Sequence, residues 1–180
     1  MQLSRKALNS RWAWTTGAAA AALLVLNLAD AALRAGTGYG TVDLQGVASG
    51  WGVRAILDRW TSPPDAALAG FLLGFDYLFM PLYAAALFCG SIAALDRFAP
   101  EAGGARRIMA LLAFAPVAGA IFDGCENALQ IVMMTRGPTD MLASFALEAT
   151  AAKYAGIAVG IVLSLAGLVG LFWKKTKRPA

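Results

Sequence analysis

The sequence predicts an all-α fold, a polytopic membrane protein built as a bundle of four transmembrane helices. The first observation is composition, because 59% of the 180 residues are hydrophobic and the mean hydropathy is +0.62, above the usual range of soluble domains. The second is length, because four apolar stretches exceed the roughly 20 residues that cross a bilayer. We expect one transmembrane domain over residues 1–180. Its predicted spans are residues 12–34, 66–95, 107–135 and 141–173.

Basic residues are distributed unevenly between these spans. Ten of the fifteen lysines and arginines fall on the side of the two termini, and four fall on the opposite side. The positive-inside rule therefore predicts that both termini are cytoplasmic. The net charge of +4 is explained by this asymmetry, so nucleic acid is not expected as a partner.

The amino-terminal stretch has a competing interpretation as a cleaved signal peptide. Residues 5–11 would supply its basic region, and Ala29-Asp30-Ala31 has the small-x-small pattern of a cleavage site. The long apolar run after Trp12, interrupted near its end by Asp30, favours a spanning helix. Cleavage would leave three spans and an amino terminus outside the cytoplasm.

The longest segment between spans, residues 36–65, is predicted to form a short amphipathic helix on the outer membrane surface. Its apolar residues alternate with charged ones at helical spacing, and Pro63-Pro64 ends it. Two interpretations of this segment remain open, a simple connection or a lid over a site beneath it. The apolar residues of the predicted helix are Trp51, Val53, Ile56, Leu57 and Trp60.

Polar side chains inside the spans define the candidate site, because an ionisable group in hydrocarbon is expensive and is a functional candidate by default. The most specific pattern is in the third span, where four polar residues share one helical stripe. These are Asp123, Glu126, Asn127 and Gln130. The other candidates are Asn27, Asp30, Asp76, Tyr83, Glu148 and Lys153.

The depths of these residues predict a pocket that opens toward the outer face. At about 1.5 Å per helical residue, they fall in the outer two-thirds of a core about 30 Å thick. Lys153 is expected to pair with Asp76 or Asp123. Five carboxylates against one ammonium would leave a large negative excess, so we expect some carboxyls to be protonated or a cation to bind.

No cofactor or metal is predicted. The chain has no histidine, which excludes His-ligated haem and the common zinc sites. Its two cysteines lie in different spans and form no redox motif. Asp76, Asp123 and Glu126 offer the oxygen ligands that hard cations prefer, but their spacing matches no defined motif and Lys153 would compete.

Three motifs occur in a fixed order along the chain: Phe75-Asp76-Tyr77 with Tyr83, then Phe122–Asn127, then Lys153. This order resembles a family of small, uncharacterised four-helix bacterial integral membrane proteins. Those proteins carry an Asp-x-x-Glu-Asn motif in the third helix and a lysine in the fourth. The resemblance implies this fold, a shared buried site and the bacterial inner (plasma) membrane, but it implies no activity.

Three functions are compatible with these features. The first is a buried charged pocket that binds, and in one variant chemically processes, an amphiphilic or lipid-like ligand. If the protein is an enzyme, Asp123 or Glu126 would be the general acid or base and Lys153 an electrostatic stabiliser. The second is a proton- or cation-coupled transporter. The third is a structural or assembly subunit with an internal ion-pair network.

The expected partner is a membrane lipid or an amphiphilic small molecule. Pairs of small residues permit close helix approach in membranes. Homo-oligomers could therefore form through the Gly70/Gly74 face or through the Gly156/Gly160 face.

Overall fold

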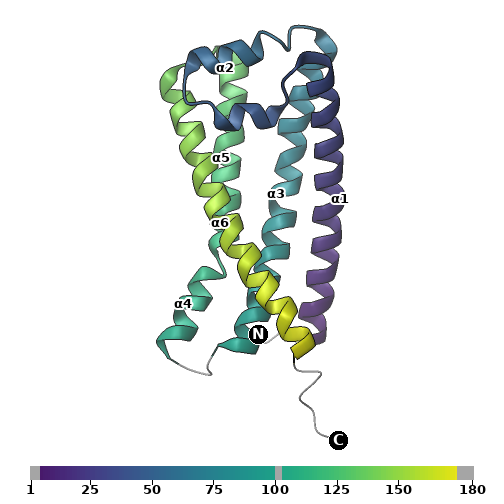
Figure 1. The fold of residues 1–180 in the computed structure, drawn as a ribbon, viewed down its shortest axis with the longest axis vertical. Coiled ribbons are helices and arrows are strands. Elements are labelled where there is room, and N and C mark those ends of the chain that lie inside the picture. The colour runs from purple at the N-terminus through teal and green to yellow at the C-terminus, as the bar shows by residue number, and fades with distance from the viewer. Residues whose placement is uncertain (1–4, 100–102, 174–180) are drawn as a thin grey trace, which may run out of the picture. The chain divides into compact units, whose positions relative to one another are not determined.

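The computed structural model describes residues 5–99 and 103–173, the last two without their side chains, and within these ranges it contains helices and no strand (Figure 1). The predicted all-α fold is confirmed for this part of the chain. The helices are α1 (Arg5–Thr37), the 3₁₀ helix η1 (Thr41–Gly46), α2 (Gly50–Leu57), α3 (Pro63–Phe98), α4 (Gly104–Leu112), α5 (Ala115–Arg136) and α6 (Asp140–Trp173).

Four helical segments are long and apolar enough to cross a membrane, which indicates a multi-pass membrane protein. They contain 32 to 36 residues, with mean hydropathies of 1.6 to 2.1 in their most apolar windows. Each predicted span lies within one of these segments or its continuation to residue 173. The segments are Arg5–Thr37, Pro63–Phe98, Gly104–Arg136 and Asp140–Leu171.

The third segment is two helices, whereas the sequence predicted one continuous span over residues 107–135. α4 ends at Leu112 and α5 begins at Ala115. Pro116, in the first turn of α5, explains the break. Proline has no N–H to donate, and its ring clashes with the carbonyl four residues earlier, here that of Leu112. The first turn of a helix tolerates proline because its N–H groups have no intrahelical acceptor.

The chain divides into two compact units, and each long spanning segment contributes to both. Unit 1 consists of residues 1–19, 81–120 and 154–180. Unit 2 consists of residues 20–80 and 121–153. Each unit is described separately below.

Close contact between backbones characterises unit 1. A Cβ atom added to Gly156 of α6 would lie 2.5 Å from the carbonyl oxygen of Ala115 in α5. A Cβ atom on Gly167 of α6 would lie 2.7 Å from the carbonyl oxygen of Gly90 in α3. Gly160 is similarly confined. This glycine face of α6 therefore packs within the chain itself, and small residues allow that approach.

In unit 2, the segment 38–62 contains η1 and α2 and packs against the ends of α1, α3, α5 and α6. The predicted short helix is present as α2, but most of its predicted apolar residues are part of the protein core, whereas Trp51 is 81% exposed. Val53, Ile56 and Trp60 are at most 4% exposed. They belong to one buried cluster with Leu33, Ala69, Leu72, Met133, Ala143 and Ala146.

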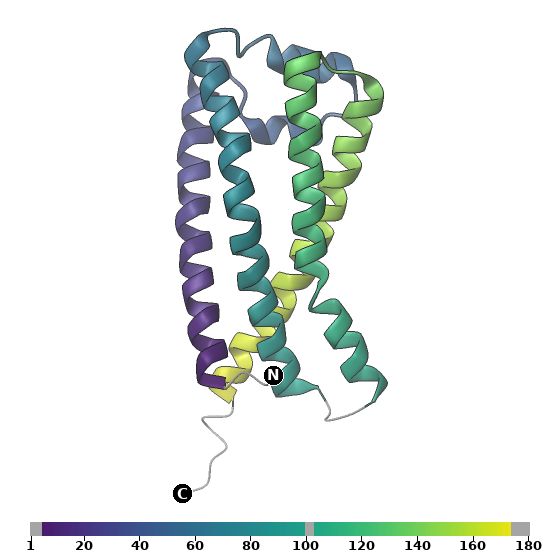
Figure 2. The same cartoon turned by 180° about the vertical axis from the view of Figure 1, so that it is seen from behind.

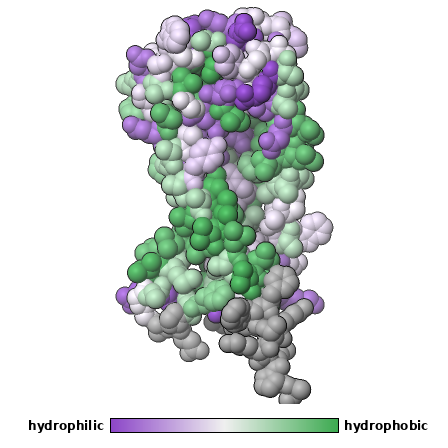
Figure 3. All heavy atoms as spheres, viewed as in Figure 1, coloured by the Kyte–Doolittle hydropathy of each residue, from purple (hydrophilic) through white to green (hydrophobic). Residues whose placement is uncertain are grey.

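The outward face of segment 38–62 is mixed, because exposed charged residues such as Arg59 lie there with Trp51, which is 81% exposed, and Val42, which is 53% exposed. Figure 3 shows strongly hydrophilic residues gathered over η1 and α2. The short turn after Arg136 joins α5 to α6, and Figures 1 and 2 show these helices side by side in unit 2. In unit 2, the buried apolar cluster therefore lies between the outer surface of segment 38–62 and the deeper parts of α5 and α6. These two helices are neighbours.

Candidate functional site

The polar stripe of α5 faces the interior of unit 2, as its spacing predicts. All four of its side chains are at most 2% exposed, and Glu126 is fully buried. Lys153 of α6 is 4% exposed, and Asp76 of α3 is half-buried. We call these six residues the polar network: Asp76, Asp123, Glu126, Asn127, Gln130 and Lys153.

Lys153 lies at the centre of the polar network. Its Nζ atom is 3.0 Å from Oδ1 of Asp123 and 2.8 Å from Oε2 of Glu126. The two carboxylates stand one turn apart on α5 and hold a single ammonium from α6. Oε2 of Glu126 is buried, and its short ionic contact with Nζ compensates that burial. Pairing with Asp123 was one of two predicted alternatives, and pairing with Glu126 was not predicted.

Gln130 provides a further polar contact to the carboxylate of Glu126. Its Nε2 atom donates a hydrogen bond of 2.7 Å to Oε1 of Glu126, one turn away on α5. Both oxygens of this fully buried carboxylate therefore have a polar neighbour. A buried carboxylate is tolerated only when it is paired and hydrogen-bonded, and this arrangement meets that condition.

Asp76 joins the polar network through Asn127. Nδ2 of Asn127 donates to Oδ2 of Asp76 at 2.8 Å and lies 3.3 Å from the carbonyl oxygen of Leu73. The charges of Asp123 and Lys153 act on the Asp76 carboxyl. Because Asp76 is half-buried while the other members are buried, it forms the accessible edge of the polar network.

Thr150 is a buried polar residue beside the network that sequence reasoning missed. It is 6% exposed and donates a hydrogen bond of 2.9 Å to the carbonyl oxygen of Ala146. It precedes Lys153 by three residues, so the two side chains share a face of α6. The position of Thr150, three residues before an intramembrane lysine, is the sequence feature that could have identified it.

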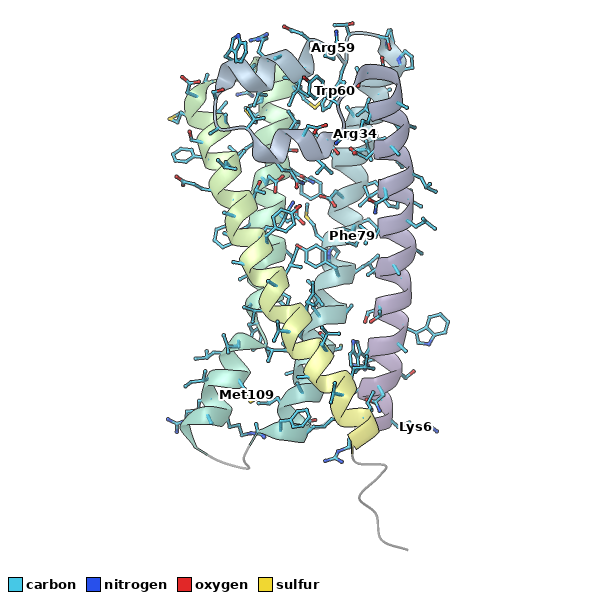
Figure 4. The ribbon with its side chains drawn as sticks, in the orientation of Figure 1. Lys6, Arg34, Arg59, Trp60, Phe79 and Met109 are labelled. Atoms are coloured by element: carbon cyan, nitrogen blue, oxygen red, sulfur yellow. The ribbon has the colours of Figure 1, made fainter. Side chains whose placement is uncertain are left out.

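Asp30 is held in a different place, at the start of η1. Its Oδ1 atom accepts hydrogen bonds from the backbone N and the Oγ1 of Thr41, at 2.6 and 2.8 Å. One turn later on α1, Arg34 pairs with Asp43 at 2.8 Å; Figure 4 labels Arg34 close to the end of α1. Asp30 therefore anchors segment 38–62 and is not a member of the polar network.

Two other candidates, Asn27 and Glu148, also lie outside the polar network. Asn27 is exposed and donates to the carbonyl oxygen of Leu23 in its own helix. Glu148 is exposed because it precedes Lys153 by five residues and is rotated from it by about 140° around α6. Tyr83 is buried and belongs to unit 1. Ligand contacts for these residues remain predictions.

The polar network has more acidic than basic groups. It contains three carboxyls and one amine, so full ionisation would leave an excess of two negative charges. Among residues 5–99 and 103–173, no group of three or more Asp, Glu, Cys or His side chains is arranged to hold a metal ion. The groups present can accept hydrogen bonds, hold a proton or attract a cationic headgroup.

Comparison with known proteins gives no family assignment. No protein-family model matches the chain, and no match was found among curated proteins or solved structures. The resemblance drawn from the motifs therefore stays an expectation, and function has to be argued from the polar network itself.

Proposed function

We propose that unit 2 contains an intramembrane binding site for the polar headgroup of an amphiphilic or lipid-like ligand. The observation that carries this proposal is the polar network, in which three otherwise apolar helices bring six polar side chains together. Ionisable groups at such positions are rare and mark ligand or ion sites in membrane proteins.

Asp76 is the residue that would meet the headgroup. It is the half-buried member of the polar network, and its described contact through Oδ2 is an uncharged amide of Asn127. Asp123 and Glu126 already share Lys153. The polar network contains three carboxyls and one amine. A ligand with an ammonium or hydroxyl group would donate further hydrogen bonds to these carboxyls.

Binding is proposed here in preference to catalysis. A general base needs a carboxylate that is free to take a proton at the reacting group. The ammonium of Lys153 contacts both Asp123 and Glu126 at 3.0 Å or less, so both carboxylates are already engaged. The catalytic roles predicted for these three residues would require the ion pairs to open first.

A structural role is the second candidate, and the same ion pairs favour it. Lys153 joins α6 to two carboxylates of α5, and Asn127 joins α5 to α3. Such a network can fix the register of helices without binding anything. The two candidates differ in what they predict for Asp76, which is outside the ion pairs.

Native mass spectrometry of the protein extracted with its own membrane lipids tests the binding site. The Asp76→Asn variant removes a charge while leaving an oxygen to accept from Asn127, so we expect a normal melting temperature and loss of the retained ligand. Asp58→Asn is the matched control, because it makes the same change at an exposed carboxylate elsewhere in unit 2. A retained species in Asp76→Asn, or no retained species in the wild type, would favour the structural role.

We further infer that the four spanning segments pack as one bundle in a bacterial inner membrane, with both termini in the cytoplasm. The charge asymmetry supports this topology. Reporter fusions test it: a carboxy-terminal fusion should be active only with a cytoplasmic reporter, and a fusion inserted after Asp58 only with a periplasmic one. The reverse pattern would overturn the topology and leave the binding site to be judged separately.

A further inference from the structure

Segment 38–62 lies directly above the polar network within unit 2. Three residues of the helices contact it in the buried apolar cluster: Leu72 of α3, Met133 of α5 and Ala146 of α6. One helical turn further along these same helices come Asp76, Gln130 and Thr150, respectively. An apolar layer one turn thick therefore separates the polar network from the outer surface of η1 and α2.

The two ends of this segment are tied to α1 and α3. Asp30 of α1 accepts two hydrogen bonds from Thr41, and the Ser62 hydroxyl donates to Asp65 at the start of α3. Between them, Nε1 of Trp60 donates to the carbonyl oxygen of Tyr39 at 3.1 Å. Figure 4 labels Trp60 beside α2, close to the top of the view. These bonds hold both ends of the segment on the α1–α3 side.

Two hydrogen bonds join the middle of the segment to α6, beside the apolar packing of Val53 and Ile56 in the buried cluster. The backbone N of Gly50 donates to Oδ1 of Asp140 at 2.7 Å. The Ser144 hydroxyl donates to the carbonyl oxygen of Ala48 at 3.2 Å. Asp140 is exposed, so water competes for its bond, and single hydrogen bonds of this kind contribute little net stability.

We propose that segment 38–62 is a lid, hinged on α1 and α3 and latched to the start of α6 by Asp140 and Ser144. Release of the latch would open unit 2 above α5 and α6, where Glu126, Gln130 and Lys153 lie. Closure would exclude water from the polar network, which strengthens electrostatic contacts to a bound headgroup. The ligand's use of this route rests on the proposed function; the motion of the lid does not.

Hydrogen–deuterium exchange of the intact protein in detergent tests the latch. Removing the carboxylate in Asp140→Ala should increase the exchange rate of peptides within residues 41–60 about tenfold, the effect of losing one hydrogen bond to a charged group. Peptides of α3 in unit 2 should be unaffected. Asp58→Ala is the matched control, because Asp58 is an exposed carboxylate of the lid itself.

Ser144→Ala provides a second variant, since Asp140 also lies in the first turn of α6 and could affect the stability of that helix. It should also speed exchange of residues 41–60, by a smaller factor. Unchanged exchange in both variants would overturn the latch.

A disulfide tests the lid as the route of access. Ala48→Cys with Ser144→Cys, in a chain with Cys89 and Cys125 replaced by serine, should lock the lid when oxidised. Delipidated protein would then be offered mixed micelles of the expression host's total lipid extract. We expect oxidised protein to acquire its lipid at least about tenfold more slowly, with recovery on reduction.

Equal uptake by the oxidised and reduced forms would overturn the lid as the route. It would leave the binding site intact, because that site is tested separately by Asp76→Asn. Lack of uptake in both forms, and in the wild type, would instead count against the proposed function.

Discussion

The two units of this protein use different means to hold helices together. Of the buried polar or charged residues among those described, Ser91 belongs to unit 1 and seven belong to unit 2. Unit 1 brings backbones close at Gly156, Gly160 and Gly167. Unit 2 places long polar side chains between its helices and covers them with an apolar layer. Packing through small residues needs no specific chemistry, which is why the proposed function is placed in unit 2.

The difference between the two units in buried polar residues is also relevant to the hypothesis of a coupled transporter. A coupled transporter needs polar groups along the whole path of its substrate. Among the described residues of unit 1, the buried side chains with a polar group are Ser91 and Tyr83. Unit 1 therefore offers fewer buried polar groups than unit 2, which is the reason for proposing binding in preference to transport.

The largest expected effect comes from removing the cation of unit 2. Lys153→Ala leaves two buried carboxylates without their partner, which should cost about 3–5 kcal/mol of unfolding free energy. Denaturant titration in detergent micelles measures this cost, with Lys6→Ala, an exposed lysine of unit 1, as the control. A loss below about 1 kcal/mol would mean that the carboxyls are stable when protonated, and would weaken the contrast between the units.

The next effect tests the packing of unit 1. Gly156→Ala places a methyl group 2.5 Å from a backbone oxygen, so we expect a loss of about 1–3 kcal/mol from overpacking. Gly74→Ala in α3 is the matched control, because nothing lies within 4 Å of its added Cβ. That change should be neutral or stabilising, by up to about 1 kcal/mol. Equal effects at both glycines would remove the evidence for backbone packing in unit 1.

A smaller effect is expected at the anchor of the lid. Asp30→Ala removes the acceptor of two hydrogen bonds from Thr41, which should cost about 1–2 kcal/mol. Hydrogen exchange should locate the effect in η1. Asn27→Ala, one turn earlier on α1 and bonded only within its own helix among the described contacts, should leave η1 unchanged. Faster exchange throughout unit 2 would instead mean that the hydrogen bonds of Asp30 stabilise the whole unit.

The smallest effect is expected at the exposed contact between α3 and α5. The Tyr77 hydroxyl donates to the carbonyl oxygen of Gly124 at 3.0 Å. Tyr77→Phe should cost about 0.5–1 kcal/mol, the net contribution of one uncharged hydrogen bond. Thermal unfolding in detergent is the measurement. A loss of stability as large as that of Lys153→Ala would show that the Tyr77–Gly124 contact, and not the ion pairs, contributes most to the stability of unit 2.

The sequence by itself determined the helical fold, the four apolar segments and the inward face of α5. These features depend on composition and on the period of 3.6 residues, which are local properties of the chain. The same periodicity placed Asp123, Glu126, Asn127 and Gln130 on one stripe. It also marked the glycines of α6 as a packing face, although only the structure located its partners in α3 and α5.

Only the tertiary structure decided which polar residues meet. A residue's rotation about its helix and the identity of its neighbours depend on how helices pack, and no single helix encodes this. Lys153 therefore acquired Glu126 as a second partner, while Asp76 bonded to Asn127 and Glu148 turned outward. Asp30, at a similar predicted depth, was bound by Thr41 across a turn of the chain. The apolar residues of α2 were likewise compatible with a membrane surface or a protein core, and the structure packs Val53 and Ile56 into the core against the ends of four helices while Trp51 stays exposed.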